Sequence, residues 1–207
     1  MKLRTYATAL AACAAFGTSI FAQANERVIQ ASFTFNGVEK QINQAVALDL
    51  NEVSGFFRPD AACQPFCIAP MQAAAQITTI DEREVINFLS QTVAAGGGLL
   101  IDSRTPEARA RGYISASVNV PTDLIGSDNP YQAQIMQALG ARAFEGSYNF
   151  ADALPLVIFD DGPTGNDAGA FITTLLEVGY PAEKISYYRG GMLVWTALGL
   201  NTEDATS

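Results

Sequence analysis

Short apolar runs of strand length, alternating with helical segments, constrain this chain more than any other feature. Leu99–Asp102 and Leu156–Phe159 are runs of this kind, and shorter ones lie at 77–79, 118–120 and 185–188. Strands that are apolar on both faces are typical of a parallel sheet covered on both sides by helices. We therefore predict an α/β fold with a parallel sheet of about five strands and helices on both faces.

Helical periodicity fills the intervals between these runs. Val85, Ile86, Leu89 and Val93 lie on one apolar face, and Thr79 and Glu82 before them have the spacing of a capping box. Further helices are predicted at 131–140, at 168–178 before Gly179, and at 190–199. The sequence between 141 and 153 is predicted to be an irregular connection.

The first residues have the features of a secretory signal peptide. A basic start, Met1-Lys-Leu-Arg, is followed by an apolar run to Phe21 and a small-residue site at Ala22-Gln-Ala. We predict that residues 1–24 are removed by cleavage after Ala24 and that the protein reaches the periplasm. The run is too short for a confident transmembrane segment. A lipoprotein-type box, Leu10-Ala-Ala-Cys, remains an alternative.

The mature chain is predicted to form one domain with additions at both ends. Residues 25–75 are assigned to an N-terminal extension, 76–200 to the domain and 201–207 to a C-terminal tail. In the extension, an alternating run ends in Asn36-Gly37, a dipeptide typical of a hairpin turn. The sequence that follows is ambiguous between strand and helix.

The charge balance limits the possible partners. The net charge is −9, and loss of Lys2 and Arg4 with the signal peptide leaves 10 basic and 21 acidic residues. Such a chain is repelled by nucleic acids and anionic membranes, so a nucleic-acid partner is excluded. An acidic surface by itself mainly favours solubility.

The composition also limits the chemistry, because the chain has no histidine. Ser-His-Asp and Cys-His catalysis and histidine zinc sites are therefore excluded. Once Cys13 is removed with the signal peptide, Cys63 and Cys67 are the only thiols. In an oxidising compartment we expect them to form a disulfide. A redox-active pair is the alternative, although redox motifs usually have two intervening residues instead of three.

An unusual loop, Asp160-Asp-Gly-Pro-Thr-Gly-Asn-Asp, connects the most apolar strand to the helix at 168–178. Loops of this kind present backbone N–H groups that bind anions, and in parallel sheets they form the ligand site. Here the loop carries three carboxylates of its own, at Asp160, Asp161 and Asp167.

Three segments together resemble the rhodanese-like family over residues 76–200. The first, LLIDSRTPEARARGYISASVNVP, contains Asp102, Arg104, Glu107, Gly112, Ile114, Asn119 and Pro121 in the register of the family pattern. The second is the strand, loop and helix from Leu156 to Gly179. The third, YYRGGMLVWTALGL, is similar to the family's Gly-Gly-x-x-x-Trp ending. Features of the loop and of YPAEKISYYRGGM also resemble an exported branch of the family.

This sequence departs from the family pattern at the catalytic position. In active members, the residue directly after the fourth strand is a cysteine that carries sulfane sulfur as a persulfide. Here that residue is Asp160, and Gly165 stands where the exported branch often has a second cysteine. Tyr113 replaces the usual histidine. A carboxylate oxygen cannot carry sulfane sulfur, so the resemblance implies that sulfur transfer is lost.

The predicted site is therefore a degenerate active-site loop with no catalytic residue, metal or cofactor. It comprises Asp160, Asp161, Gly162, Pro163, Thr164 and Gly165. We expect the Asp160 carboxylate to accept N–H bonds from the loop, in place of a bound anion. The protein is then a binding or accessory module, and not an enzyme, with a protein or small-molecule partner at this loop. The alternative is an active sulfurtransferase or thiol-redox protein that uses Cys63 or Cys67.

Other interpretations of the acidic loop remain open. In the simplest one its residues only shape turns, and Asn166 or Asp167 is the helix N-cap. Oxygen ligands from Asp160, Asp161, Asn166 and Asp167 could also suit a hard cation. A covalent acceptor role for Asp160 lacks a companion base or a nearby lysine.

Three further residues have structural interpretations. Trp195 is predicted to pack in the core. Arg104 is expected to pair with a carboxylate near the strand end, and Asp102 to order the adjacent turn.

Overall fold

The structure is a computed structural model that describes residues 30–44, 53–54 and 68–204. Residues 1–24, predicted to be the signal peptide, lie outside this part of the chain. Cys63 and Cys67 lie outside it too, so the disulfide stays a prediction. Among the described residues, no helix is long and apolar enough to cross a membrane.

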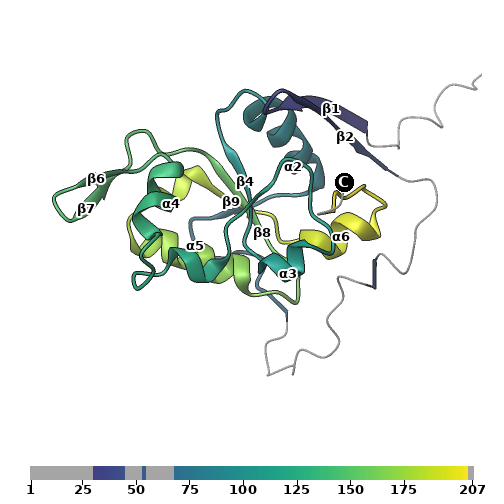
Figure 1. Cartoon of the computed structure of the whole chain (residues 1–207). Helices are drawn as coiled ribbons and strands as arrows, with labels where there is room; N and C mark the ends of the chain where they lie inside the picture. The colour runs from purple at the N-terminus through teal and green to yellow at the C-terminus, as the bar shows by residue number, and fades with distance from the viewer. Residues whose placement is uncertain (1–29, 45–52, 55–67, 205–207) are drawn as a thin grey trace, which may run out of the picture.

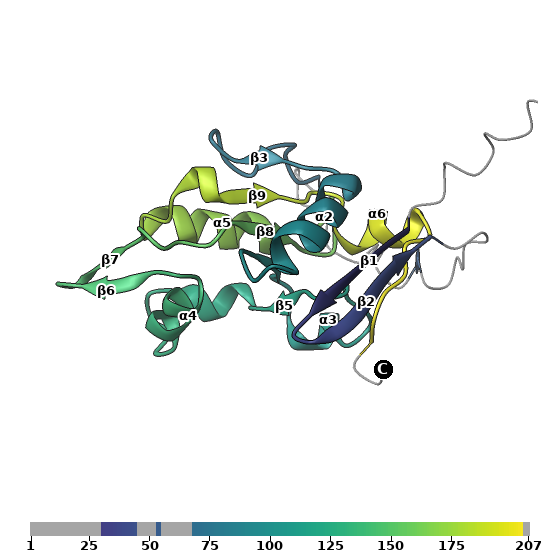
Figure 2. The same ribbon diagram turned by 90° about the horizontal axis from the view of Figure 1, so that it is seen from above.

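A five-stranded parallel sheet forms the centre of the molecule, as the sequence predicts (Figure 2). Its strand order is β3-β9-β8-β4-β5. The strands span Thr78–Thr79 (β3), Ile185–Tyr187 (β9), Leu156–Phe159 (β8), Leu99–Asp102 (β4) and Val118–Asn119 (β5). All four residues of the central strand β8 are buried, which explains its uninterrupted apolar sequence.

Helices cover both faces of this sheet (Figure 1). On one face lie α2 (Glu82–Phe88), its π-helical continuation η1 (Leu89–Val93) and α6 (Gly191–Ala197). On the other lie α4 (Gln132–Ala138), α5 (Asp167–Glu177) and the 3₁₀ turn η2 (Thr122–Ile125). Two short elements, α3 (Pro106–Arg109) and the 3₁₀ turn η3 (Ala182–Lys184), complete the connections.

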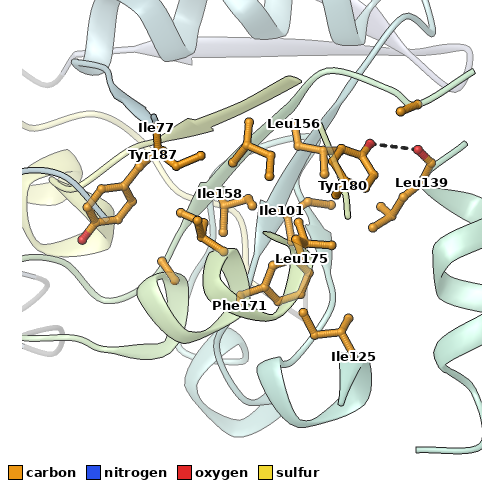
Figure 3. Close-up of a cluster of buried hydrophobic side chains, with 14 of the residues drawn as sticks. Ile77, Ile101, Ile125, Leu139, Leu156, Ile158, Phe171, Leu175, Tyr180 and Tyr187 are labelled. Carbon is orange, nitrogen blue, oxygen red and sulfur yellow. Dashed lines mark hydrogen bonds between the residues drawn. The ribbon is translucent and has the colours of Figure 1, made fainter. Parts of the chain in front are cut away.

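The alternation of side chains along each strand divides the core into two clusters. Leu100 and Val157 belong to the cluster under α2 and α6, whereas their neighbours Ile101 and Ile158 face α5. Figure 3 shows the second cluster, in which Phe171 lies against the strand residues. Trp195 is fully buried in the first cluster, as predicted.

The cap of α2 differs from the predicted one. Asp81 is the N-cap and forms a capping box with Glu84, with two hydrogen bonds of 3.0 Å. The predicted box of Thr79 and Glu82 is wrong because Thr79 still belongs to β3, where it pairs with Tyr187. The helix therefore begins two residues later than the capping motif suggested.

A hairpin of the N-terminal extension packs on the first core cluster. Its strands are β1 (Gln30–Phe35) and β2 (Val38–Asn43), and the predicted Asn36-Gly37 turn has positive φ at both residues. The ambiguous sequence after this turn is thus a strand up to Asn43. Phe33 and Ile42 are buried against α2 and α6.

A second hairpin occupies part of the predicted irregular connection. Its strands β6 (Arg142–Phe144) and β7 (Ser147–Asn149) pair antiparallel and extend away from the sheet (Figure 1). The prediction of irregular structure is wrong over these residues. Each strand has only three residues, and Glu145-Gly146 is a weaker turn signal than Asn-Gly.

Candidate functional site

The acidic loop begins at the carboxyl end of the central strand. β8 ends at Phe159, and α5 begins at Asp167. Two loop carbonyls accept hydrogen bonds from the first turn of α6: the Met192 N–H donates to the Asp160 carbonyl (3.1 Å), and the Leu193 N–H donates to that of Asp161 (2.9 Å). The loop and the start of α6 therefore fix each other, since these N–H groups have no partner within their own helix.

The Asp160 side chain occupies the centre of the loop. Its Oδ1 accepts the Gly162 N–H at 2.8 Å, and its Oδ2 accepts the Ala168 N–H at 3.0 Å. The residue is fully buried. A Cβ on Gly165 would lie 2.6 Å from the Asp160 Cγ, so a residue with a side chain at this position would collide with the carboxylate. The carboxylate thus takes N–H groups that could otherwise bind an anion.

Burial dominates the protonation equilibrium of this carboxylate. Loss of hydration raises the pKa of Asp160 from 3.8 to about 6, although the N–H groups of Ala168 and Gly162 act in the opposite direction. The negative charges of Asp167 and Asp161 raise it further. Asp160 therefore titrates close to neutral pH.

The same carboxylate caps α5. Asn166 occupies the predicted N-cap position, but its side chain makes no capping hydrogen bond. The Asp160 Oδ2 instead accepts the N–H of Ala168, the second residue of the helix. The predicted N-cap position at Asn166 is thus confirmed, but the capping hydrogen bond comes from Asp160 and not from the Asn166 side chain.

Asp161, the next residue, points into a buried ion-pair network. Its Oδ1 lies 3.2 Å from Nη1 of Arg104, which is fully buried and also binds Asp102 through Nε (2.8 Å) and Nη2 (2.7 Å). Asp102 Oδ1 further accepts the Arg104 N–H at 3.2 Å. The predicted carboxylate pairing of Arg104 and the turn-ordering role of Asp102 are both confirmed.

The network keeps Arg104 charged in the interior. Burial lowers the pKa of the Arg104 guanidinium, but the hydrogen bonds and charges of Asp102 and Asp161 outweigh this effect and raise it. Arg109 adds a second cation, with Nη1 at 3.0 Å from the Asp102 Oδ2. Its guanidinium carbon lies 3.7 Å from the ring centre of Tyr113, the residue at the family's usual histidine position.

The loop carboxylates do not converge on a common point. Asp160 is directed to backbone N–H groups and Asp161 to Arg104. Within the described ranges, no group of three or more His, Cys, Asp or Glu side chains could hold a metal ion. A covalent acceptor must be reached by its substrate, and the Asp160 carboxylate is covered on all sides.

A segment that the sequence did not connect with the loop lies against it. The Ala69 N–H donates to the Pro163 carbonyl at 2.7 Å, and the Ala69 carbonyl accepts from Nε of Arg189 at 3.0 Å. We call residues 68–75 the covering segment. Both bonds use the backbone of Ala69, so the side chains of the segment give no signal of the contact.

The covering segment and α5 enclose a cavity of about 390 Å³, which we call the α5 pocket. Ala69, Pro70 and Ala73 line one side of it. The other side is formed by the outer face of α5 from Asn166 to Glu177, with Gly165 beside it and Tyr187 of β9 at its base. The pocket thus adjoins the acidic loop without including its carboxylates.

An open parallel sheet with an N–H-lined loop between its central strand and a helix defines a class of anion-binding α/β domains. Residues 85–198, more than half of the chain, match the rhodanese-like domain family. The chain belongs to this family, as its three sequence segments predict.

Solved structures similar to this chain are distant in sequence. A Rhodopseudomonas palustris protein of unknown function, described as a possible tyrosine phosphatase, is 21% identical, with 63% of this chain and 88% of that one covered at a TM-score of 0.45. A human single-domain sulfurtransferase is 24% identical. The match covers 57% of this chain and 95% of that one, with a TM-score of 0.41. A rhodanese-related protein from Thermoplasma volcanium is 16% identical. The match covers 61% of this chain and 97% of that one, with a TM-score of 0.41. No curated protein matches the sequence.

Proposed function

We propose that this protein is an exported rhodanese-like module that binds a partner and does not transfer sulfur. One observation carries the proposal: the Asp160 carboxylate accepts the Gly162 and Ala168 N–H bonds at the centre of the loop. In active relatives this position holds the cysteine that becomes a persulfide. Here its place is taken by an oxygen anion without a polarisable sulfur.

The proposal follows from the chemistry of the reaction. A thiolate attacks the sulfane sulfur of thiosulfate, sulfite leaves, and the resulting persulfide passes its sulfur to cyanide to give thiocyanate. Backbone N–H groups and a helix N-terminus favour the thiolate because they lower the pKa of the thiol. Asp160 satisfies these same groups and offers no sulfur nucleophile.

The test is thiosulfate:cyanide sulfur transfer by residues 25–207, measured as thiocyanate produced. Three proteins are compared: the native chain, Asp160→Cys, and the matched control Asp160→Ser. Serine has nearly the shape of cysteine but carries a hydroxyl in place of the thiol. We expect the native chain and the serine variant to be inactive and the cysteine variant to turn over. Turnover by the native chain at the rate of the cysteine variant would refute the proposal.

The alternative, a sulfurtransferase or thiol-redox protein, is favoured by one contact. The Ala69 N–H donates a hydrogen bond to the Pro163 carbonyl of the loop, and Cys67 precedes Ala69 by only two residues in the sequence. A native thiol count separates the two functions. No free thiol argues against the alternative, whereas a free thiol together with activity abolished by Cys67→Ser supports it.

Export is a separate part of the proposal. The basic start, apolar run and Ala22-Gln-Ala site support cleavage after Ala24 and a periplasmic location. The intact mass of the protein from the periplasmic fraction is expected to correspond to a start at Asn25. A lipid-modified Cys13 would instead indicate the lipoprotein alternative.

A further inference from the structure

Tyr187 has an unusual environment at the base of the α5 pocket. Its side chain is 2% exposed, and its ring belongs to the second core cluster. The hydroxyl points outward from that cluster (Figure 3) and has no hydrogen-bond partner in the described part of the chain. Among the described residues, every side-chain oxygen that is fully buried has a hydrogen-bond partner. The Tyr187 hydroxyl has none, so it is not fully buried and reaches the surface of the pocket that Tyr187 lines.

A hydroxyl that opens into a pocket and has no protein partner indicates a place for a polar ligand atom, because its hydrogen bonds are available there. Burial and the charge of Asp160 raise the pKa of Tyr187 to about 12. The hydroxyl is therefore neutral at pH 7 and can both donate and accept a hydrogen bond.

The charge around the pocket favours a cation. Of the described residues that line the pocket, only Glu177 carries a charge at neutral pH, and the ion pairs of the described chain do not include it. It is also the last residue of α5, where the helix dipole adds negative potential. The carboxylate of Asp160 lies close enough to Tyr187 to raise its pKa, and the charge of Arg189 acts in the opposite direction. The Arg189 guanidinium itself is engaged by the Ala69 carbonyl.

The shape of the pocket favours a linear ligand. Its wall follows α5 from Asn166 to Glu177, a distance of about 16 Å at 1.5 Å per residue. Between these polar ends the lining residues are short and uncharged: Ala69, Pro70, Ala73, Gly169, Ala170, Thr173 and Thr174. A flexible methylene chain can extend along such a groove between its polar ends.

We propose that the α5 pocket binds a linear aliphatic polyamine, with an ammonium group beside Glu177 and another amino group hydrogen-bonded to the Tyr187 hydroxyl. This inference rests on the binding role proposed above and gives it a ligand class. It does not depend on whether Asp160 prevents sulfur transfer.

The test is titration of residues 25–207 with spermidine, followed by calorimetry and by amide chemical shifts. We expect saturable binding with shifts along α5 and β9 and with weaker affinity at high salt. 1,8-Octanediol, of similar length but neutral, is expected to bind weakly, and octanedioate not at all. No saturable binding of spermidine, or equal binding of the diol, would overturn the proposal.

Variants separate the pocket from general attraction to an acidic protein. Tyr187→Phe is expected to weaken binding about fivefold, through loss of one hydrogen bond, without lowering the melting temperature. Glu177→Gln is expected to weaken it two- to fivefold. The matched control Glu183→Gln removes an exposed charge outside the pocket lining and is expected to change nothing. Equal losses at Glu177 and Glu183 would overturn the proposal.

The two proposals can fail separately. Sulfur transfer by a native chain that still binds spermidine through Tyr187 would refute only the loss of catalysis. A native chain that is inactive and does not bind spermidine would refute only the ligand class.

Discussion

Asp160 and Asp161 are neighbours in the chain and are both almost fully buried, at 0% and 4% exposure, yet they are held in opposite ways. The Asp160 carboxylate is bound by two backbone N–H groups, and burial raises its pKa to about 6. The Asp161 carboxylate faces the Arg104 guanidinium. One aspartate occupies an anion site formed by the backbone, and the other neutralises a buried cation.

This difference separates two parts of the site. Asp160 stands where the chemistry can change, and the Arg104 network stabilises the fold around it. Backbone N–H groups remain when the side chain changes, so position 160 can hold a carboxylate or a thiolate on the same loop. Arg104 instead needs its carboxylates, because a buried charge without a partner is costly. We therefore expect substitutions around Arg104 to affect stability, and substitutions at Asp160 to affect chemistry and pH response.

The largest expected effect comes from Arg104→Met. It leaves Arg109 as the ion-pair partner of Asp102 and deprives Asp161 of its closest cation. We expect the free energy of unfolding to fall by about 3–5 kcal/mol, measured by urea denaturation. Arg111→Met is the control, because that side chain is 46% exposed and 4.0 Å from Asp161. A loss of similar size in both variants would contradict the distinction.

The next effect is a dependence of stability on pH that arises from Asp160. Its pKa is raised in the folded state, so the folded protein holds the proton more tightly between pH 3.8 and about 6. Its contribution to stability is therefore present below this window and is lost as the pH rises through it. We expect the native chain to lose about 2 kcal/mol relative to Asp160→Asn between pH 4 and pH 7. A difference that does not vary with pH would show that Asp160 has an ordinary pKa.

The smallest effect concerns the space that Asp160 fills. Gly165→Ala places a Cβ 2.6 Å from the Asp160 Cγ, and we expect it to cost about 1–3 kcal/mol. In an Asp160→Ala background most of that cost is expected to disappear, which a double-mutant cycle measures. Gly169→Ala is the control, since its nearest contact would be an ordinary 3.8 Å. Additive effects of Gly165→Ala and Asp160→Ala would show that the carboxylate does not lie above Gly165.

The fold could be predicted to a large extent because its signals are local. The strands Leu99–Asp102 and Leu156–Phe159 follow from apolar runs of strand length, and the Asn36-Gly37 turn from the conformational freedom of its residues. The cap of α2 was misplaced because Thr79 has capping chemistry but is held in β3 by Tyr187. Pairing with a distant strand is not visible in a local motif.

The site was predictable in its location and in the kind of contact that Asp160 and Arg104 make, but not in most of the residues that make those contacts. A loop rich in glycine and aspartate after a buried strand indicated an anion site at Asp160. The partnership of Asp161 with Arg104 joins residues 57 positions apart, and that of Ala69 with Arg189 joins residues 120 apart. The sequence predicts a carboxylate partner for Arg104 without identifying Asp161, and it gives no signal of the contact between Ala69 and Arg189. Both contacts depend on how the crossover connections return to the same edge of the sheet.

The most direct measurement of the central claim is the intact mass of Asp160→Cys after incubation with thiosulfate, in a background that carries Cys63→Ser and Cys67→Ser. We predict that this variant gains one sulfur atom and releases it to cyanide, whereas the same background with Asp160 gains none. The first result would show that the N–H groups of the loop can still support a sulfur anion once the carboxylate is removed. Sulfur on the protein that retains Asp160, or none on the cysteine variant, would contradict the claim.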